Sequence, residues 1–192
     1  MPLPMAFLLG AFVLVGLGAL YVFGRRLAGA WVRYRGTRVV VCPESRDLVA
    51  VEVDARHAAL TSSQGRADLR LEACTRWPER MGCGQECLGQ IESAPEACLL
   101  RNILGDWYQG KSCVLCGRSF HPVQWHDHRP ALRAPDGTIR EWDGFRPEQV
   151  IDVLATHAPV CWDCRVAESF RREHPELVTD RPPRPGPPPS MA

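Results

Sequence analysis

The chain has 192 residues and a mass of 21.4 kDa, with 23 Lys and Arg against 22 Asp and Glu, so its formal net charge is +1. This balance argues against nucleic acid as a partner, because neutralising several phosphates needs a clear excess of basic residues. Hydrophobic residues make up 45% of the chain and charged residues 23%, which is typical of a folded protein. The nine cysteines are many for a chain of this size and require a chemical explanation.

The N-terminal segment 1–24 contains no charged side chain. Its apolar run 5–23 is long enough, as a helix, to cross about 30 Å of hydrocarbon, so we predict a retained transmembrane anchor with the lipid bilayer as its partner. A cleaved signal peptide is the alternative. Such a peptide would begin with basic residues and end in a small-residue cleavage site, whereas here the arginines follow the apolar run.

The next segment, 25–37, is predicted to be a basic juxtamembrane region. Arginines gather in and just after it, with Trp31 and Tyr34 among them: Arg25, Arg26, Arg33, Arg35 and Arg38. Basic loops stay in the cytosol, and Trp and Tyr favour the membrane interface. We therefore expect a single-pass protein with its N-terminus outside and its body in the cytosol.

The segment 38–110 is predicted to be a small mixed α/β subdomain. Runs of β-branched and alternating apolar residues predict strands at 39–41, 48–54 and 69–72. Two helices should follow. Ser93 and Glu96 have capping-box spacing, and the apolar residues in 98–108 form one stripe that we interpret as core.

Two cysteine pairs in the segment 111–180 have the spacing of metal ligands: Cys113 and Cys116, and Cys161 and Cys164. Stable disulfides are disfavoured in the cytosol, so clustered cysteines there more often bind metal or do redox chemistry. A C-x-x-C turn lets two thiolates reach one ion, and two such pairs complete the tetrahedral shell of structural zinc. We predict one zinc ion on these four. Iron alone or an iron–sulfur cluster stays an open alternative.

The surroundings of these pairs carry a resemblance to a known fold group. Gly117 after the first pair permits a tight turn, and Phe120 can cover the metal. A hairpin is predicted around 135–137, a short helix opening at Pro147, and a last helix at 165–173 after the second pair. Over 113–174 this order resembles the treble clef of zinc modules, except for the extra helix at 147–156. The resemblance implies a structural zinc site but no particular function.

The remaining cysteines allow a second zinc site, formed by Cys42, Cys74, Cys83 and Cys87. Cys83 and Cys87 are four residues apart, so both thiols would share one face if that stretch were helical. The alternative is that these are ordinary buried thiols, as we assume for Cys98.

Other chemistry finds less support in the sequence. His126 and His128 could be part of a hydrolytic metal site, but no third ligand or general base can be named, so we interpret them as surface or packed histidines. Covalent haem needs C-x-x-C-H, whereas Gly117 and Arg165 follow the two pairs. No phosphate-binding loop, dinucleotide turn or nucleophile elbow occurs.

Together these features predict an α+β protein with one N-terminal transmembrane helix, a treble-clef-like zinc module and a disordered Pro-rich tail at 181–192. The predicted function is that of a membrane-tethered, cytosol-facing, zinc-binding accessory or interaction protein without catalytic activity, with an unidentified protein as a further partner. The alternative is a thiol-based metal-handling or redox protein.

Overall fold

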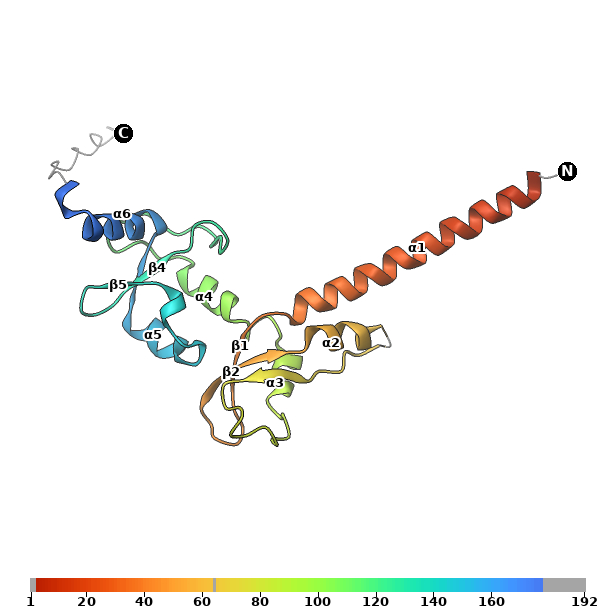
Figure 1. Ribbon diagram of the computed structural model, residues 1–192, viewed down its shortest axis with the longest axis horizontal. Coiled ribbons are helices and arrows are strands. Elements are labelled where there is room, and N and C mark those ends of the chain that lie inside the picture. Colours follow the sequence, from red (N-terminus) through yellow and green to blue (C-terminus); the bar gives the residue numbers. More distant parts are fainter. Residues whose placement is uncertain (1–2, 64, 178–192) are drawn as a thin grey trace, which may run out of the picture. The chain divides into compact units, whose positions relative to one another are not determined.

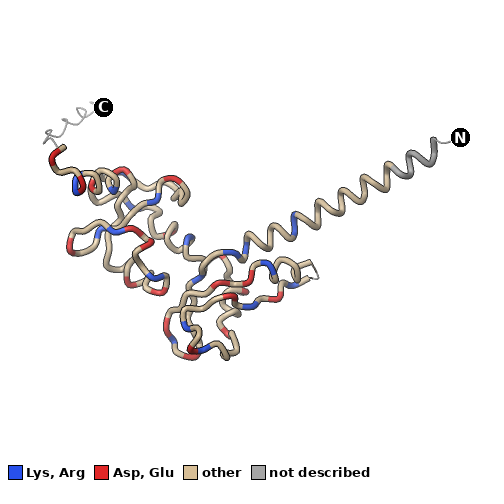
Figure 2. The backbone as a smooth tube through the Cα atoms, in the orientation of Figure 1, with Lys and Arg blue, Asp and Glu red and all other residues tan. Residues whose placement is uncertain are grey.

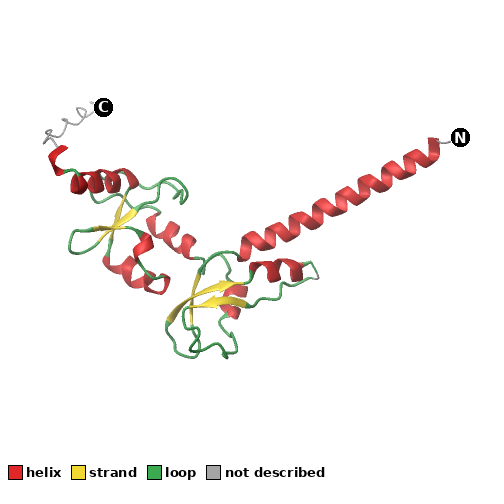
Figure 3. Ribbon diagram, viewed as in Figure 1, coloured by secondary structure: helices red, strands yellow, loops and turns green. Residues whose placement is uncertain are grey.

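A computed structural model describes residues 3–63 and 65–177 (Figure 1). The predicted Pro-rich tail at 181–192 lies outside the described residues. Contacts divide the chain into a first unit, Met1–Gln109 with Phe145–Ala155, and a second unit, Gly110–Gly144 with Thr156–Ala192. Both units mix helices with short strands (Figure 3), as the predicted α+β class requires.

The chain begins with a long helix, α1 (Leu3–Tyr34), whose part Gly10–Tyr34 is long and apolar enough to cross a membrane. Its apolar side chains are exposed, with 83% of Phe12 accessible. In Figure 2, the basic residues of this helix lie toward its C-terminal end. The prediction of one N-terminal helix long and apolar enough to span a membrane thus agrees with the structure, and the helix continues through the basic segment that follows.

Arg38 closes the C-terminal end of α1. The side chain is fully buried at the start of β1 (Arg38–Val41). Its Nη1 donates to the carbonyl oxygens of Tyr34 at 2.6 Å and Gly36 at 2.9 Å, and its Nη2 donates to that of Arg33 at 2.5 Å. The last carbonyls of a helix have no partner within it, and a cation there is favourable. Arg38 is therefore a structural cap, which corrects its grouping with the membrane-facing arginines.

Replacing Arg38 with Ala should lower the free energy of unfolding of the first unit by about 3 kcal/mol, because three carbonyls lose partly buried, charge-assisted hydrogen bonds. Thermal unfolding of the full chain in detergent, followed by circular dichroism, measures the change. The matched control is Arg35→Ala. Arg35 is exposed and lies 4.7 Å from the Trp31 ring, so we expect a loss of about 1 kcal/mol or less. Equal losses in the two variants would contradict the capping role.

The first unit is built on an antiparallel sheet in the order β1-β2-β3, with β2 at Leu48–Val53 and β3 at Leu71–Cys74. The strands predicted at 39–41 and 48–54 are confirmed, and the third begins two residues later than predicted. Inward-facing side chains of the sheet pack with those of the helices in one core. Its buried members include Val40, Val49, Val51, Val53, Ala58, Leu71, Cys87 and Ile91.

One helix of the first unit was not expected. In α2 (Ala55–Ser62), Asp54 is the N-cap, and its Oδ1 accepts from the backbone N–H of His57 at 2.9 Å. Asp54 also pairs with Arg70 at 2.6 Å. This capping interaction favours helix directly after β2.

The two helices predicted to follow β3 are present as α3 (Leu88–Ser93) and α4 (Leu100–Tyr108). The predicted capping box is wrong, because Ser93 ends α3, and α4 begins after Leu99 without a side-chain cap. The first turn of α4 is instead attached to the strand region, where the Leu100 N–H donates to the Thr37 carbonyl at 3.1 Å. Burial of Leu104 and Tyr108 supports the interpretation of the apolar stripe as core.

The second unit contains a small antiparallel sheet in the order β5-β4-β6. Its strands are β4 (Ala131–Arg133), β5 (Ile139–Arg140) and β6 (Ala158–Val160). The predicted hairpin is confirmed, with Gly137 at φ +87° and the Thr138 N–H donating to Asp136 Oδ1 at 2.9 Å. The strand β6 was not predicted, and α6 (Trp162–Glu173) follows it almost directly.

Between β5 and β6 the chain forms short helical segments: η1 (Trp142–Gly144), η2 (Pro147–Gln149) and α5 (Val150–Thr156). Pro147 opens η2 as predicted, since its missing N–H has no partner to lose there. The sequence predicts that the whole range 111–180 belongs to the zinc module. Contacts instead assign Phe145–Ala155, which lies inside that range, to the first unit. A last 3-10 segment, η3 (Pro175–Leu177), follows α6.

Candidate metal centre

The first cysteine pair lies on a tight turn of the second unit. The backbone N–H of Cys113 donates to the carbonyl of Arg118 at 2.9 Å, and that of Gly117 donates back to the carbonyl of Cys113 at 2.8 Å. Gly117 has φ +74°, as predicted, a conformation that costs glycine little. An isolated bridge between Ser112 and Ser119 closes the turn. The pair is thereby fixed at the tip of a small hairpin.

The second pair lies where β6 passes into α6. Cys161 is the N-cap residue of α6, and Cys164 lies in its first turn. Two backbone donors connect this junction to the first turn: Val114 N–H donates to the carbonyl of Pro159 at 3.0 Å, and Cys161 N–H donates to Cys113 Sγ at 3.3 Å. The unexpected strand β6 is thus the element that brings the two pairs together.

The four sulfur atoms of Cys113, Cys116, Cys161 and Cys164 all lie within 4.8 Å of one another. A zinc–sulfur bond of about 2.3 Å places the corners of a regular tetrahedron about 3.8 Å apart. Cys116 Sγ and Cys161 Sγ are 3.7 Å apart, close to that edge and far beyond the length of a disulfide, about 2.05 Å. All four cysteines are free thiols. The set therefore fits one metal ion such as zinc with little movement.

Apolar side chains shield one side of the cluster. Cys113, Ala131 and Val160 are buried, and Phe120 and Ile139 pack against them together with Cys161 and Cys164. The packing of Phe120 agrees with its predicted covering role. Cys116 is exposed, so the cluster has one solvent-facing edge.

The thiols of the cluster differ in how readily they ionise. Burial opposes ionisation of Cys113, but the backbone N–H groups of Cys161, Leu115 and Cys116 outweigh it and lower the pKa of Cys113 to about 6. Burial raises the pKa of Cys164, and the neighbouring thiols raise it further. Burial also raises the pKa of Cys161. Among these thiols Cys113 is thus the readiest to ionise, whereas Cys161 and Cys164 must release protons when a cation binds.

No protein-family model, curated protein or solved structure significantly matches the chain. The functional interpretation therefore rests on these residues and their geometry.

Two ion pairs flank the metal centre and were not identified from the sequence. Arg118 pairs with Asp163, and Arg165 pairs with Glu141. The Asp163 carboxylate, and after it the sulfurs of Cys116 and Cys161, raise the pKa of Arg118. A cation is thus held near a cluster that becomes negatively charged when its thiols ionise. Partners so distant along the chain leave no signal in local spacing.

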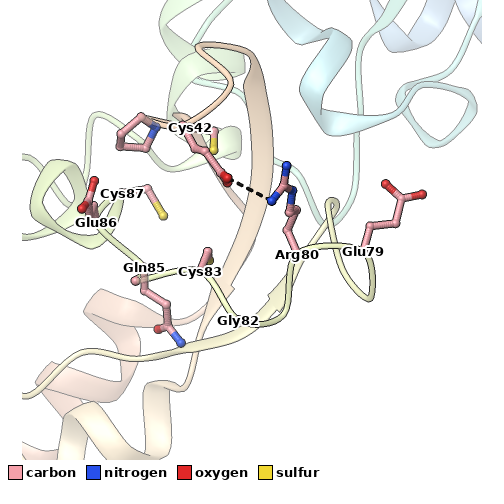
Figure 4. Close-up of a pocket in the computed structure, with 11 residues that line it drawn as sticks. Cys42, Glu79, Arg80, Gly82, Cys83, Gln85, Glu86 and Cys87 are labelled. Carbon is pink, nitrogen blue, oxygen red and sulfur yellow. Dashed lines mark ion pairs between the residues drawn. The ribbon is translucent and has the colours of Figure 1, made fainter.

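The second predicted cysteine set lies in the first unit. Cys42, Cys83 and Cys87 line one cavity of about 500 Å³ (Figure 4), and Cys74 packs against the same core as Cys42 and Cys87. The stretch 83–87 is not helical, since Gln85 has φ +54° and α3 begins only after Cys87. Within residues 3–63 and 65–177, only the set in the second unit has all its ligand atoms within 4.8 Å.

The histidines do not belong to either cysteine set, although His128 and Cys161 line one pocket. The His128 ring packs edge-on against Trp162 at 4.7 Å between centroids, and His126 is exposed. In the described part of the chain, neither belongs to a group of three converging metal ligands. The geometry therefore adds nothing to the hydrolase alternative.

Proposed function

We propose that this protein is a membrane-tethered, cytosol-facing zinc protein that acts as an accessory or interaction module without catalytic activity. The observation that carries the proposal is the convergence of four cysteine sulfurs within 4.8 Å in the second unit. Four protein thiolates fill the tetrahedral shell of zinc and leave no position for a substrate, which is typical of structural rather than catalytic sites. The order of turn, hairpin and helix around them supports a module of the treble-clef type.

Tethering to a membrane is supported by α1, with its long apolar part and the arginines that follow. Arg25 and Arg26 are exposed, so both are free to face lipid headgroups and bias the downstream chain toward the cytosol. A cytosolic body would keep the nine cysteines reduced and available for metal.

Removing residues 1–24 should move the chain from the membrane fraction to the supernatant without loss of zinc. The cut spares the carbonyls at 33–36 that Arg38 caps, so the first unit keeps its structure. Cell fractionation and zinc analysis measure both outcomes. A shortened chain that stays with membranes would show that another surface binds lipid.

Orientation is tested separately with the full chain. A C-terminal reporter enzyme that is active only outside the cytosol should be inactive when fused to this protein. An active reporter would overturn the cytosolic placement of the body, and with it the argument for reduced thiols.

A second candidate function, thiol-based metal handling or redox chemistry, is favoured by one thiol of the first unit. The backbone N–H of Ser45, helped by the side chain of Arg76, lowers the pKa of Cys42 to about 7 against the effect of burial. Cys42 therefore has thiolate character at neutral pH, which both metal ligands and redox thiols need.

A further inference from the structure

The turn that carries Cys42 repeats the backbone geometry of the turn that carries Cys113. The Cys42 N–H donates to the carbonyl of Asp47 at 2.8 Å, and the Arg46 N–H donates back to the carbonyl of Cys42 at 2.8 Å. These are the same offsets along the chain as in the turn from Cys113 to Arg118. The fifth residue of each turn has a left-handed backbone, with φ 63° at Arg46 where the other turn has glycine.

The two turns also present the same groups to their cysteine sulfur. In the second unit, the backbone N–H groups two and three residues after Cys113 point at its thiol. In the first unit, the N–H groups of Glu44 and Ser45, at the same two offsets, point at Cys42. Ser45 occupies the position of the second cysteine in a C-x-x-C turn, and its hydroxyl also reaches the Cys42 sulfur. A backbone arranged to hold a thiolate is thus present in both units.

A left-handed conformation at a non-glycine residue such as Arg46 is unfavourable and persists only where the surroundings require it. The turn joins β1 to β2, which pair directly at Val41 and Leu48. Two-residue connections would close such a hairpin with less strain. We therefore interpret the longer, strained turn as a conformation that positions the Cys42 thiol for binding.

Further thiols surround Cys42. The cavity beside it is lined by Cys83, from the loop after β3, and by Cys87, just before α3 (Figure 4). Cys74 ends β3 and packs against the same core. Burial raises the pKa of Cys87, and negative charge on Cys74, Cys83 and Cys42 raises it further, so these groups act on one another electrostatically.

We propose that the first unit holds a second zinc ion on four thiolates: Cys42, Cys74, Cys83 and Cys87. This site goes beyond the proposed function, which needs only the centre in the second unit. The second set is more open than the first, and the intervening loop 75–87 contains no helix or strand by which its position is fixed. No three of its thiols converge as the four of the second unit do, so closing the coordination shell requires both the loop 75–87 and the turn at Cys42 to move inward.

One basic side chain, that of Arg76, donates directly to a proposed ligand sulfur, while the cavity itself is lined by Arg80 and by the acidic Glu44, Glu79 and Glu86. Four thiolates and one zinc ion carry a net charge of −2. Arg76 Nη1 lies 3.3 Å from Cys42 Sγ, and Arg80 pairs with Glu44 at 3.2 Å at the cavity wall (Figure 4). Hydrogen bonding from a guanidinium to a ligand sulfur stabilises the thiolate form that zinc requires.

The test counts zinc in the full chain, purified in detergent with reductant and zinc, by elemental analysis against protein concentration. We expect two ions per chain in the natural protein, one in Cys83→Ser, one in Cys113→Ser and none in the double variant. Cys98→Ser is the matched control and should keep two, because Cys98 belongs to neither set. One ion in the natural protein, unchanged by Cys83→Ser but lost in Cys113→Ser, would overturn the second site and leave the proposed function intact.

A gain-of-ligand variant guards against simple misfolding. Cys74→Ser should bind one ion, and adding Ser45→Cys to it should restore the second, because the new thiol completes a C-x-x-C turn beside Cys42. Alkylation of the natural protein by a maleimide, mapped by mass spectrometry, needs no variant at all. Removing zinc with a chelator should speed labelling of Cys42 and Cys83 at least tenfold. Equal labelling with and without zinc, or a disulfide among these cysteines in reduced preparations, would refute the proposal and favour redox chemistry.

Discussion

Replacing any one of the four cysteines of the second unit with Ser should remove one zinc ion from the chain and unfold that unit. The residues are Cys113, Cys116, Cys161 and Cys164. The effect should be large because zinc bound to such sites contributes about 10–16 kcal/mol, which is as much as the whole stability of a typical domain. The four variants should behave alike, since each leaves an incomplete shell around the same ion.

The small core of the second unit explains why it depends on metal. Its strands have two or three residues each, and no residue of α6 is buried. So little buried apolar surface cannot offset the entropy of ordering the chain. The turn and the β6–α6 junction meet at the four sulfurs, so losing the ion separates the elements that the unit is made of.

Limited proteolysis and zinc analysis of the full chain measure these outcomes together. Residues 113–144 and 156–174 should become protease-sensitive in all four variants, while the first unit, which includes 145–155, stays resistant. Cys98→Ser serves as the control and should change neither zinc content nor cleavage. If Cys113→Ser and Cys161→Ser kept full metal and full resistance, a shared ion would be ruled out.

Local sequence signals predicted those parts of the fold that local geometry determines. Gly117 and the Pro135–Gly137 turn each need a backbone conformation that few residues adopt, so residue type alone indicated the turn. The spacing of the two C-x-x-C pairs indicated which four thiols to group. Tertiary contacts later placed their sulfurs within 4.8 Å.

Other elements escaped prediction because their cause lies far away in the sequence. The strand β6 has only three residues, includes Pro159, and exists because β4 pairs with it. The turn at Cys42 carries Arg46 where glycine would have revealed a left-handed backbone. Arg38 resembles a surface charge in sequence and becomes a buried cap only once α1 ends against β1. In contrast, Asp54 is a residue type that favours a helix N-cap, so the start of α2 could have been predicted from the sequence. The alternating apolar residues of 48–54 instead favoured a strand that included Asp54.

Acid should release zinc from the second unit steeply. Zinc binds thiolates, so every ligand that is protonated before binding must lose its proton. The raised pKa values of Cys161 and Cys164 mean that both are protonated in the metal-free cluster at pH 7. Each proton released changes the affinity tenfold per pH unit. Zinc affinity should therefore fall at least 100-fold between pH 7 and pH 6.

Below pH 6 the dependence should become steeper, because Cys113, whose pKa is lowered to about 6, then also starts protonated. Affinity should fall at least about 10⁵-fold in total from pH 7 to pH 5. Competition with a chelator of known proton affinity measures the slope of the logarithm of zinc affinity against pH. The Cys83→Ser variant is used so that the first unit does not contribute. A slope of one proton or fewer per zinc ion would show that most of the four thiols are not ligands.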